Sequence, residues 1–445
     1  MKIALINVMN KSKNFAMNKD LNGGFGTADD YGYSFTSKIL RFIKKNSIKL
    51  PVIEIAYLQE IFKEKGYEVS YFEGKLPETY FDLILIYGTI VDYKNENKVC
   101  QVLKKTFPKS KIGFFGPFVK IKPDLFKSGD FNICGESEYF FIYKFKSENQ
   151  LQGHITVSEK IDLDDLPLPS FDNFPINSYS YFPAIKQKPF LVLQASRGCP
   201  YSCRFYCTYG EYQGSKVRLR SVKKIVKDIV YLQKKYNIKG IQFRDPTFGL
   251  IPNFIEDFCK ELKETYVNIK WGMETRLDLL NEEKIKKMFE VGLRNINVGI
   301  ETNDINIAKK NKRLLIQKNH QENIIKFCEK IGVKISAFYI LGYEGDTEET
   351  VKNTINYAKK LNTLIARFSV STPYPGTGFF NQLEKENRIL TYDFEKYTQF
   401  NLVYRHNNFS PKQVQKLLDK AYRNYYFRIS YLFKFLKWQI REFWL

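Results

Sequence analysis

The chain has 445 residues, a formal net charge of +22 and a hydrophobic content of 44%. The length predicts two domains of ordinary size, and the lack of any run of about 18 apolar residues excludes a membrane-spanning helix. Seven cysteines, an odd number with three on one loop, argue against a disulfide framework. Together with a start that looks like a strand and not a secretory signal, they predict a reducing, cytoplasmic setting.

The positive charge suggests nucleic acid, anionic lipid or an anionic substrate as partners. The basic residues are mostly Lys and are spread along the predicted helices, which is typical of solvated helix faces. The sequence has no nucleic-acid motif, so we expect no nucleic-acid partner.

Residues 1–145 alternate between apolar, strand-like runs and amphipathic stretches. This alternation predicts a Rossmann-like parallel sheet covered by helices on both faces. Helices are expected at 53–65 and near 95–106. The expected strands are 3–6, 69–72, 82–87, 111–115 and 131–134.

Small residues follow three of these strands. In parallel sheets ligands bind beyond the carboxyl ends of the strands, and glycine lets a ligand approach the backbone closely. The residues concerned are Gly88, Thr89, Gly116, Pro117, Gly135 and Glu136. Asn22–Thr27, in a long insertion after the first strand, is rich in glycine but lacks the spacing and the Lys-Ser/Thr of a phosphate loop. We expect it to be a flexible loop over a ligand or the active site.

Residues 146–189 read as a linker, because Asp162–Ser170 is rich in proline and has no period. From residue 190 the alternation resumes with six expected strands and intervening helices, which predicts an open, partial (β/α)6 TIM barrel over 190–380. The expected strands are 190–195, 240–244, 269–274, 295–301, 334–341 and 366–370. Barrel active sites lie at the carboxyl ends of the strands. Five ends are polar or turn-forming, which predicts a site there: Arg244–Thr247, Glu274–Arg276, Glu301, Gly342–Gly345 and Thr372–Gly376.

The first barrel strand runs into a loop that holds Cys199, Cys203 and Cys207. Thiolates are soft ligands suited to iron–sulfur clusters or zinc. A set of three leaves one metal position open, as catalytic metal sites do. A structural zinc site, or cysteines clustered by chance, is the alternative interpretation.

This loop resembles the cluster loop of the radical S-adenosylmethionine (radical SAM) enzymes, Cys-x3-Cys-x2-Cys with an aromatic residue before the last cysteine. Tyr206 is that aromatic residue, and the second spacing is one residue longer, which a one-residue bulge could absorb. The resemblance implies a [4Fe–4S] cluster on the three cysteines and a flavodoxin or ferredoxin as electron donor. It also implies S-adenosylmethionine bound by Tyr206, Glu274, Arg276, Glu301, Leu341 and Gly342.

Residues 1–145 resemble the cobalamin (B12)-binding domain of one radical SAM subfamily, through their Gly-Thr and Gly-Pro strand ends and the Gly-Glu-x-Glu at 135–138. The Asp-x-His-x-x-Gly motif, which supplies a histidine ligand to cobalt, is missing here. The resemblance implies cobalamin near Gly88, Thr89, Gly116, Pro117, Gly135 and Glu136. It also implies methyltransferase activity, C-methylation of an unknown small-molecule or lipid substrate. No catalytic residue can be singled out.

Two other functions stay open from the sequence. The charge suggests a tRNA-modifying methylthiotransferase, although the N-terminal half has only Cys100 and Cys134 where three further cysteines are expected. The irregular cysteine spacing suggests a non-catalytic, metal-stabilised binding protein.

The C-terminal residues 381–445 predict a helical extension. Its end, Tyr425–Leu445, interleaves aromatic and basic residues. This pattern is typical either of peripheral contact with an anionic membrane or of a helix that packs its aromatic face on the barrel.

Overall fold

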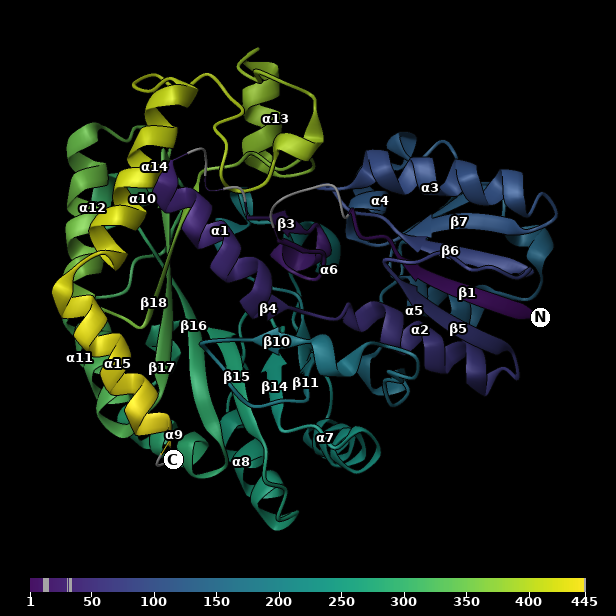
Figure 1. The fold of residues 1–445 in the computed structure, drawn as a ribbon, viewed down its shortest axis with the longest axis horizontal. Helices are drawn as coiled ribbons and strands as arrows, with labels where there is room; N and C mark the ends of the chain where they lie inside the picture. Colours follow the sequence, from purple (N-terminus) through teal and green to yellow (C-terminus); the bar gives the residue numbers. More distant parts are fainter. Residues whose placement is uncertain (11–15, 30, 32–33, 444–445) are drawn as a thin grey trace.

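The computed structural model describes residues 1–10, 16–29, 31 and 34–443. Two six-stranded parallel sheets lie side by side, and each is covered by helices (Figure 1). The predicted α/β class is confirmed.

The N-terminal sheet is built from apolar runs that are buried on both faces; all five residues of its strand β6 are buried. The sheet order β5-β1-β6-β7-β8-β9 reverses direction between β1 and β6, where such sheets bind ligands. The carboxyl ends of the strands point toward the second sheet (Figure 1). The strands are β1 (Lys2–Asn7), β5 (Glu68–Glu73), β6 (Leu83–Tyr87), β7 (Lys111–Phe115), β8 (Phe131–Cys134) and β9 (Gly153–Thr156). Helices α2 (Ile53–Glu64), α3 (Tyr93–Thr106), α4 (Pro117–Ile121) and α5 (Ser137–Tyr139) cover it.

The second sheet is the predicted partial barrel. Its six strands follow one another in chain order and all neighbours are parallel. The strands are β11 (Phe190–Leu193), β14 (Gly240–Phe243), β15 (Lys270–Thr275), β16 (Leu293–Glu301), β17 (Lys334–Leu341) and β18 (Ile365–Val370). The helices that follow them are α7 (Val222–Tyr236), α8 (Phe254–Glu264), α9 (Glu282–Glu290), α11 (Lys318–Ile331) and α12 (Glu348–Leu361).

The insertion between β1 and α2 is ordered structure that joins the two sheets. Its elements are β2 (Met17–Asn18), the short helix η1 (Asn22–Gly24), β3 (Thr27–Ala28), α1 (Phe35–Ser47) and β4 (Ile48–Lys49). Strand β4 pairs with β10 (Ser180–Tyr181), and α1 crosses the face of the barrel (Figure 1). Asn22–Thr27, expected to be a flexible loop, is instead packed between the sheets, with Phe25 fully buried.

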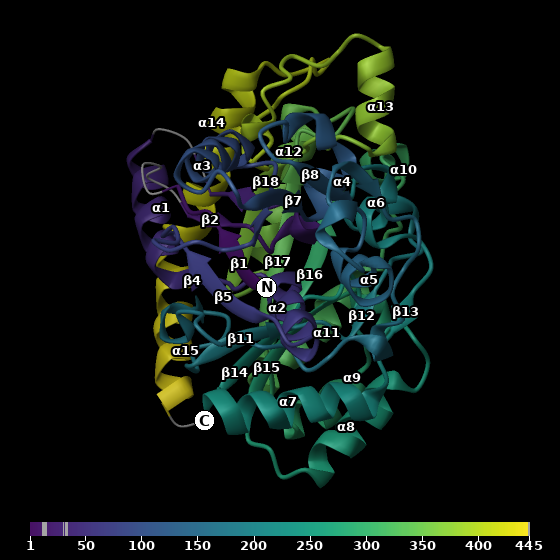
Figure 2. The same ribbon diagram turned by 90° about the vertical axis from the view of Figure 1, so that its right-hand side faces the viewer.

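The C-terminal extension is helical, as predicted, and consists of α13 (Gly378–Lys385), α14 (Pro411–Tyr426) and α15 (Ile429–Phe443). Helix α14 packs along β18, where the hydroxyls of Tyr422 and Tyr426 donate to the carbonyls of Phe368 and Ala366 at 2.7 and 2.8 Å. Helices α1 and α15 lie along the same edge of the molecule (Figure 2). None of the described helices is long and apolar enough to cross a bilayer.

Candidate active site at the carboxyl ends of the barrel strands

A cavity of about 720 Å³ opens at the carboxyl ends of the barrel strands. Its inner wall holds Tyr206 and Cys207 of the cysteine loop together with Glu274 and Glu301, from the ends of β15 and β16. The predicted convergence of polar strand ends on the cysteine loop is therefore present. A cavity with a few polar groups among apolar walls is the usual form of a substrate site.

The cysteine loop forms a short helical turn. Gly198, at φ +94°, turns the chain out of the barrel, and the short helix η7 (Ser202–Phe205) follows. The amides of Tyr206 and Cys207 both donate to the carbonyl of Cys203 at 3.0 Å. The extra residue thus completes a helical turn and forms no bulge. Residues four apart lie on one helix face, so Cys203 and Cys207 are stacked one turn apart.

All three thiols are free and partly exposed, as cluster ligands must be. Among the described residues, no group of three His, Cys, Asp or Glu side chains is close enough to hold one metal ion. A four-iron cluster takes each thiolate on a different iron, so its sulfurs stand further apart than the ligands of a single ion. The donor set therefore fits an iron–sulfur cluster.

Glu301 ends β16 with a left-handed backbone, φ +69°, which is rare for a residue with a side chain. Its Oε1 lies 2.3 Å from the point that a Cβ on Gly299 would occupy, so a side chain at residue 299 would displace this carboxylate. Arg313 donates to the carbonyl of Gly299 at 2.5 Å. Burial raises the pKa of Glu301, and the charge of Arg313 opposes that shift.

The other two predicted ligands of S-adenosylmethionine on strand ends differ in how they are paired. Glu274 accepts from Arg244 in an ion pair and from the Tyr209 hydroxyl at 3.4 Å. Arg276 holds Asp278 through Nε and Nη2 at 3.0 and 2.7 Å. Within the described part of the chain, the buried Nη1 of Arg276 has no hydrogen-bond partner, which leaves a donor for a ligand carboxylate.

Leu341 and Gly342 lie at the end of β17, where an adenine is expected. Gly342 has φ +72°, and its carbonyl accepts from Tyr404 at 2.8 Å. The next residue, Tyr343, meets the ring of Tyr206 edge to face at 5.5 Å. The aromatic residue of the cysteine loop is thus positioned by the strand that the resemblance assigns to the adenine.

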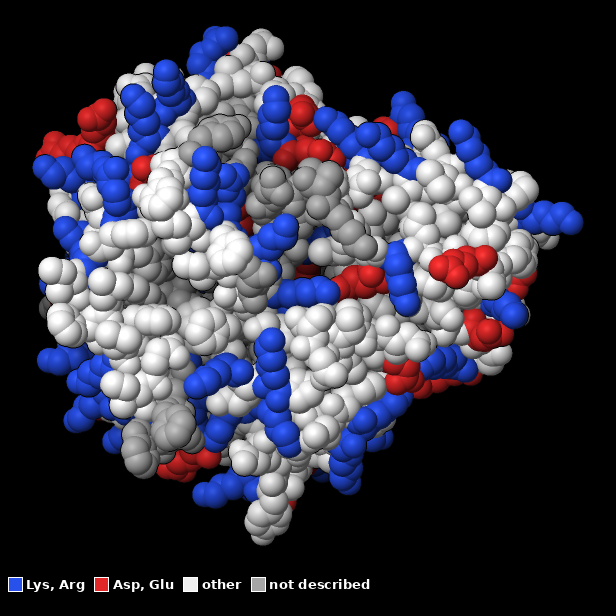
Figure 3. All heavy atoms as spheres, in the orientation of Figure 1, with Lys and Arg blue, Asp and Glu red and all other residues white. Residues whose placement is uncertain are grey.

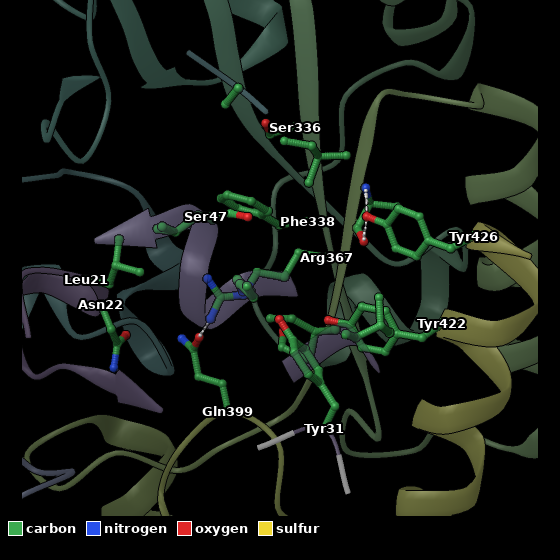
Figure 4. A pocket seen from close by; sticks show the side chains of 18 of the residues that line it. Leu21, Asn22, Tyr31, Ser47, Ser336, Phe338, Arg367, Gln399, Tyr422 and Tyr426 are labelled. Atoms are coloured by element: carbon green, nitrogen blue, oxygen red, sulfur yellow. Dashed lines mark hydrogen bonds between the residues drawn. The ribbon is translucent and has the colours of Figure 1, made fainter. Parts of the chain in front are cut away.

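Two arginines of this region make contacts that the sequence did not indicate. Arg244 is buried and bridges Glu274 to Asp20 of the insertion, at 2.9 Å to Asp20. Arg367 on β18 points into the cavity toward Gln399, at 3.3 Å (Figure 4). Arg244 lies in the predicted strand-end set, but its partner is 224 residues away, and no periodicity or spacing links them. Arg367 lies within an apolar strand run, where nothing in the sequence marks it as facing a cavity.

The six residues predicted for cobalamin lie at the strand ends of the N-terminal sheet, but the chain itself covers them. Gly88, Thr89, Gly116, Pro117, Gly135 and Glu136 are all buried. A Cβ on Gly88 would lie 2.4 Å from Val119, and one on Gly135 would lie 2.1 Å from the carbonyl oxygen of Val157. These glycines are therefore required by packing within the domain.

The cover is the segment Met17–Ala28 of the insertion. The Tyr87 hydroxyl donates to the carbonyl of Gly24 at 3.1 Å, and Phe25 meets Phe118 edge to face at 5.8 Å. Lys19 forms a buried ion pair with Glu96 at 2.6 Å, and the same carboxylate holds both the amide and the hydroxyl of Thr89. The strand ends are thus closed by packing and by buried charge.

Glu136 and its neighbours form a buried network between the two sheets. Glu136 pairs with Arg218 at 2.5 Å, and Glu138 pairs with Arg197 of the barrel at 2.7 Å. Burial raises the pKa of Glu136 and the two arginines lower it, with a net fall. The carboxylates of the Gly-Glu-x-Glu sequence therefore hold the domains together in this arrangement.

Residues 193–358 match the profile of the family described as the radical SAM superfamily. The matched segment contains the cysteine loop and the barrel strands β14 to β17. An uncharacterized methyltransferase of Pyrococcus horikoshii is 28% identical over 421 residues, which are 86% of this chain and 89% of that protein.

Two solved radical SAM structures share the fold. The methyltransferase TsrM from Kitasatospora setae, with cobalamin and a [4Fe–4S] cluster bound, has a TM-score of 0.60 at 12% identity and covers 86% of this chain and 78% of that chain. The cobalamin-dependent radical SAM enzyme OxsB, with aqua-cobalamin bound, has a TM-score of 0.65 at 14% identity. The match covers 94% of this chain and 66% of OxsB. The Rossmann-like sheet, partial barrel and helical extension of this chain are therefore an arrangement found in cobalamin-binding radical SAM enzymes.

Proposed function

We propose that this protein is a radical SAM enzyme that methylates carbon, with a [4Fe–4S] cluster on Cys199, Cys203 and Cys207. The supporting observation is that Cys207 lines the wall of the same cavity as Glu274 and Glu301. The chain spans 89% of a relative that is named a methyltransferase. Two enzymes of the same fold bind cobalamin, which makes cobalamin the methyl carrier we propose.

Cys199, Cys203 and Cys207 would hold the cluster, which, once reduced by a low-potential flavodoxin- or ferredoxin-type donor, would supply the electron for radical cleavage of S-adenosylmethionine. The chain's own residues bind and orient the ligand. The free Nη1 of Arg276 is placed to donate to its carboxylate, and Glu301 to accept from its ammonium or ribose groups. Phe338, Tyr422 and Tyr426 give the cavity aromatic walls that exclude water from a radical.

The residues proposed for cobalamin do not fit a corrin as they stand, because Met17–Ala28 seals them. Loading requires this segment to leave the strand ends. We therefore draw no step of the reaction through the corrin.

The test is anaerobic reconstitution with iron and sulfide, followed by dithionite and S-adenosylmethionine. We expect visible cluster absorbance and 5′-deoxyadenosine from the wild type, and neither from Cys203→Ser. Cys259→Ala, a cysteine of α8 that the cluster does not use, is the matched control and should behave as the wild type. Iron bound without formation of 5′-deoxyadenosine would refute the proposal.

A further inference from the structure

The outer half of the active-site cavity is apolar and reaches the protein surface between α1 and α15. Ile43 of α1, Phe427 between α14 and α15, and Leu432 of α15 line the cavity and are themselves 51%, 55% and 55% exposed. Side chains that line a cavity and are also exposed mark its mouth. Apolar side chains, not charged ones, therefore form the entrance.

Charged and polar groups gather at the barrel end of the cavity, among them Cys207, Glu274, Glu301 and the pair Arg367–Gln399, and Lys44 of α1 lines the cavity as well. Figure 4 shows the aromatic side chains of Phe338, Tyr422 and Tyr426 near Arg367. A molecule that fills this space has a polar part at the barrel and an apolar part directed outward. That is the shape of an amphiphile.

Helix α15 carries two apolar faces. Tyr431 and Trp438 pack onto the protein, at 7% and 6% exposure. A second stripe faces outward with helical spacing, namely Ile429, Leu432, Phe433, Leu436 and Ile440, all at least 55% exposed. A second apolar stripe exposed along a whole helix marks an interaction surface.

Basic residues flank these apolar stripes. Helix α1 contains Lys38, Arg41, Lys44 and Lys45 and no acidic residue, and Lys38 and Lys45 are exposed while Lys44 pairs with Asp29. Helix α15 carries Lys434, Lys437 and Arg441; Lys437 is exposed, Lys434 pairs with Glu329 and Arg441 donates to the carbonyls of Glu329 and Lys330. Figure 3 shows uncharged side chains over α15 with Lys and Arg around them. Apolar side chains rimmed by positive charge are complementary to a bilayer that contains anionic lipid.

We propose that α1 and α15 rest on an anionic bilayer and that the cavity takes a lipid substrate from it, with the hydrocarbon part in the mouth and the polar part near Arg367. This inference deepens the proposed function, since it assigns a substrate class to the same cavity. One surface meets all three requirements of such a substrate: an apolar entrance, an apolar passage and a polar inner end next to the cysteine loop.

The first test is sedimentation of the full chain with phosphatidylcholine vesicles, with and without phosphatidylglycerol. We expect the wild type to sediment with the anionic vesicles, and added salt to weaken that binding. Phe433→Asn/Leu436→Asn should lower the partition coefficient about tenfold or more, because two side chains that lie outside the cavity no longer enter the bilayer. Leu390→Asn, at a leucine that is 47% exposed and does not line the cavity, is the matched control and should bind as the wild type does.

The second test separates the cavity from the surface. The probe is parinaric acid, a fatty acid whose fluorescence rises when it enters an apolar cavity. Ser369→Phe fills the cavity from β18, so it should abolish this rise in fluorescence while vesicle binding stays unchanged. The proposed membrane surface would be wrong if the wild type does not bind vesicles, if it instead self-associates through this face, or if the double Asn variant binds vesicles as well as the wild type does. No binding of parinaric acid by the wild type would overturn the lipid cavity.

These outcomes are distinguishable from failure of the proposed function. The double Asn variant should still form 5′-deoxyadenosine at the wild-type rate in detergent-free buffer, because neither Phe433 nor Leu436 lines the cavity. Loss of 5′-deoxyadenosine in every variant and in the wild type would count against the radical chemistry and not against the lipid surface.

Discussion

Replacing Glu54 by Gln should make the protein more stable at neutral pH and flatten its pH dependence. Glu54 is buried at the start of α2, and its Oε1 accepts from Ser137 at 2.6 Å and from Tyr212 of the barrel domain at 3.0 Å. Burial, with the nearby charge of Glu138, raises its pKa to about 8. Gln keeps the oxygen that both hydroxyls use and cannot ionise.

The sign follows from proton linkage. A carboxyl whose pKa is raised in the folded state gives its full contribution to the free energy of unfolding below its ordinary pKa. This contribution is lost as pH rises toward the folded-state pKa of about 8. Each pH unit in that window costs about 1.4 kcal/mol, so the wild type should lose up to about 3 kcal/mol between about pH 5.5 and about pH 7.5 through this group.

The assay is urea unfolding of the wild type, Glu54→Gln and the control Glu60→Gln at the two pH values. The midpoint of Glu54→Gln should exceed that of the wild type at the higher pH and converge with it at the lower. An identical pH slope in the wild type and Glu54→Gln would refute the reasoning.

Two further predictions follow from the same interface and from the barrel. Phe25→Ala should increase the amount of hydroxocobalamin that the protein retains after desalting, because loss of a fully buried phenyl costs the packing of Met17–Ala28 about 3–5 kcal/mol. The control is Phe35→Ala, at a side chain of the same insertion that is 79% exposed. Equal retention by Phe25→Ala and the wild type would contradict a closed cover. Burial lowers the pKa of Lys334 to about 7, so the stability of the wild type should rise between about pH 7 and about pH 10 as the unfolded chain alone keeps this proton. Lys334→Met should remove that rise. Thermal melting temperatures of the variant that rise over this pH range as they do in the wild type would contradict the prediction.

The barrel could be predicted from the sequence because each of its strands is an apolar run bounded by polar turns. Strand β17 has the predicted bounds, Lys334–Leu341, and the other five differ from prediction by one or two residues at an end. The cysteine loop was equally visible, since three ligands within nine residues are a local signal. The spacing could not predict the backbone conformation around the extra residue, because that conformation depends on the Cys203 carbonyl, which accepts from the amides of both Tyr206 and Cys207.

The insertion was hidden from sequence reasoning for a physical reason. The glycines of Asn22–Thr27 look like those of a loop, and only contacts with Tyr87 and Pro117, far along the chain, show that they allow close packing. Helix α1 has a clear amphipathic stripe, but part of that stripe faces a cavity and not a core, so its partners could not be inferred. Strand β9 was missed because three of its four residues are exposed and none is buried.

One insertion therefore forms parts of both proposed ligand sites. Its first half, Met17–Ala28, closes the strand ends where a corrin would bind, and its second half, α1, forms one side of the cavity mouth. Asp29, directly after the cover, pairs with Lys44 of α1 at 2.8 Å and with Arg367 of the barrel at 3.4 Å. These ion pairs connect the cover to the cavity wall. A displacement of Met17–Ala28 therefore has to break them or move Lys44 and Arg367 along with the segment. Occupation of the two sites should consequently be coupled, so that hydroxocobalamin changes the binding of parinaric acid in the wild type but not in a variant with Asp29→Asn.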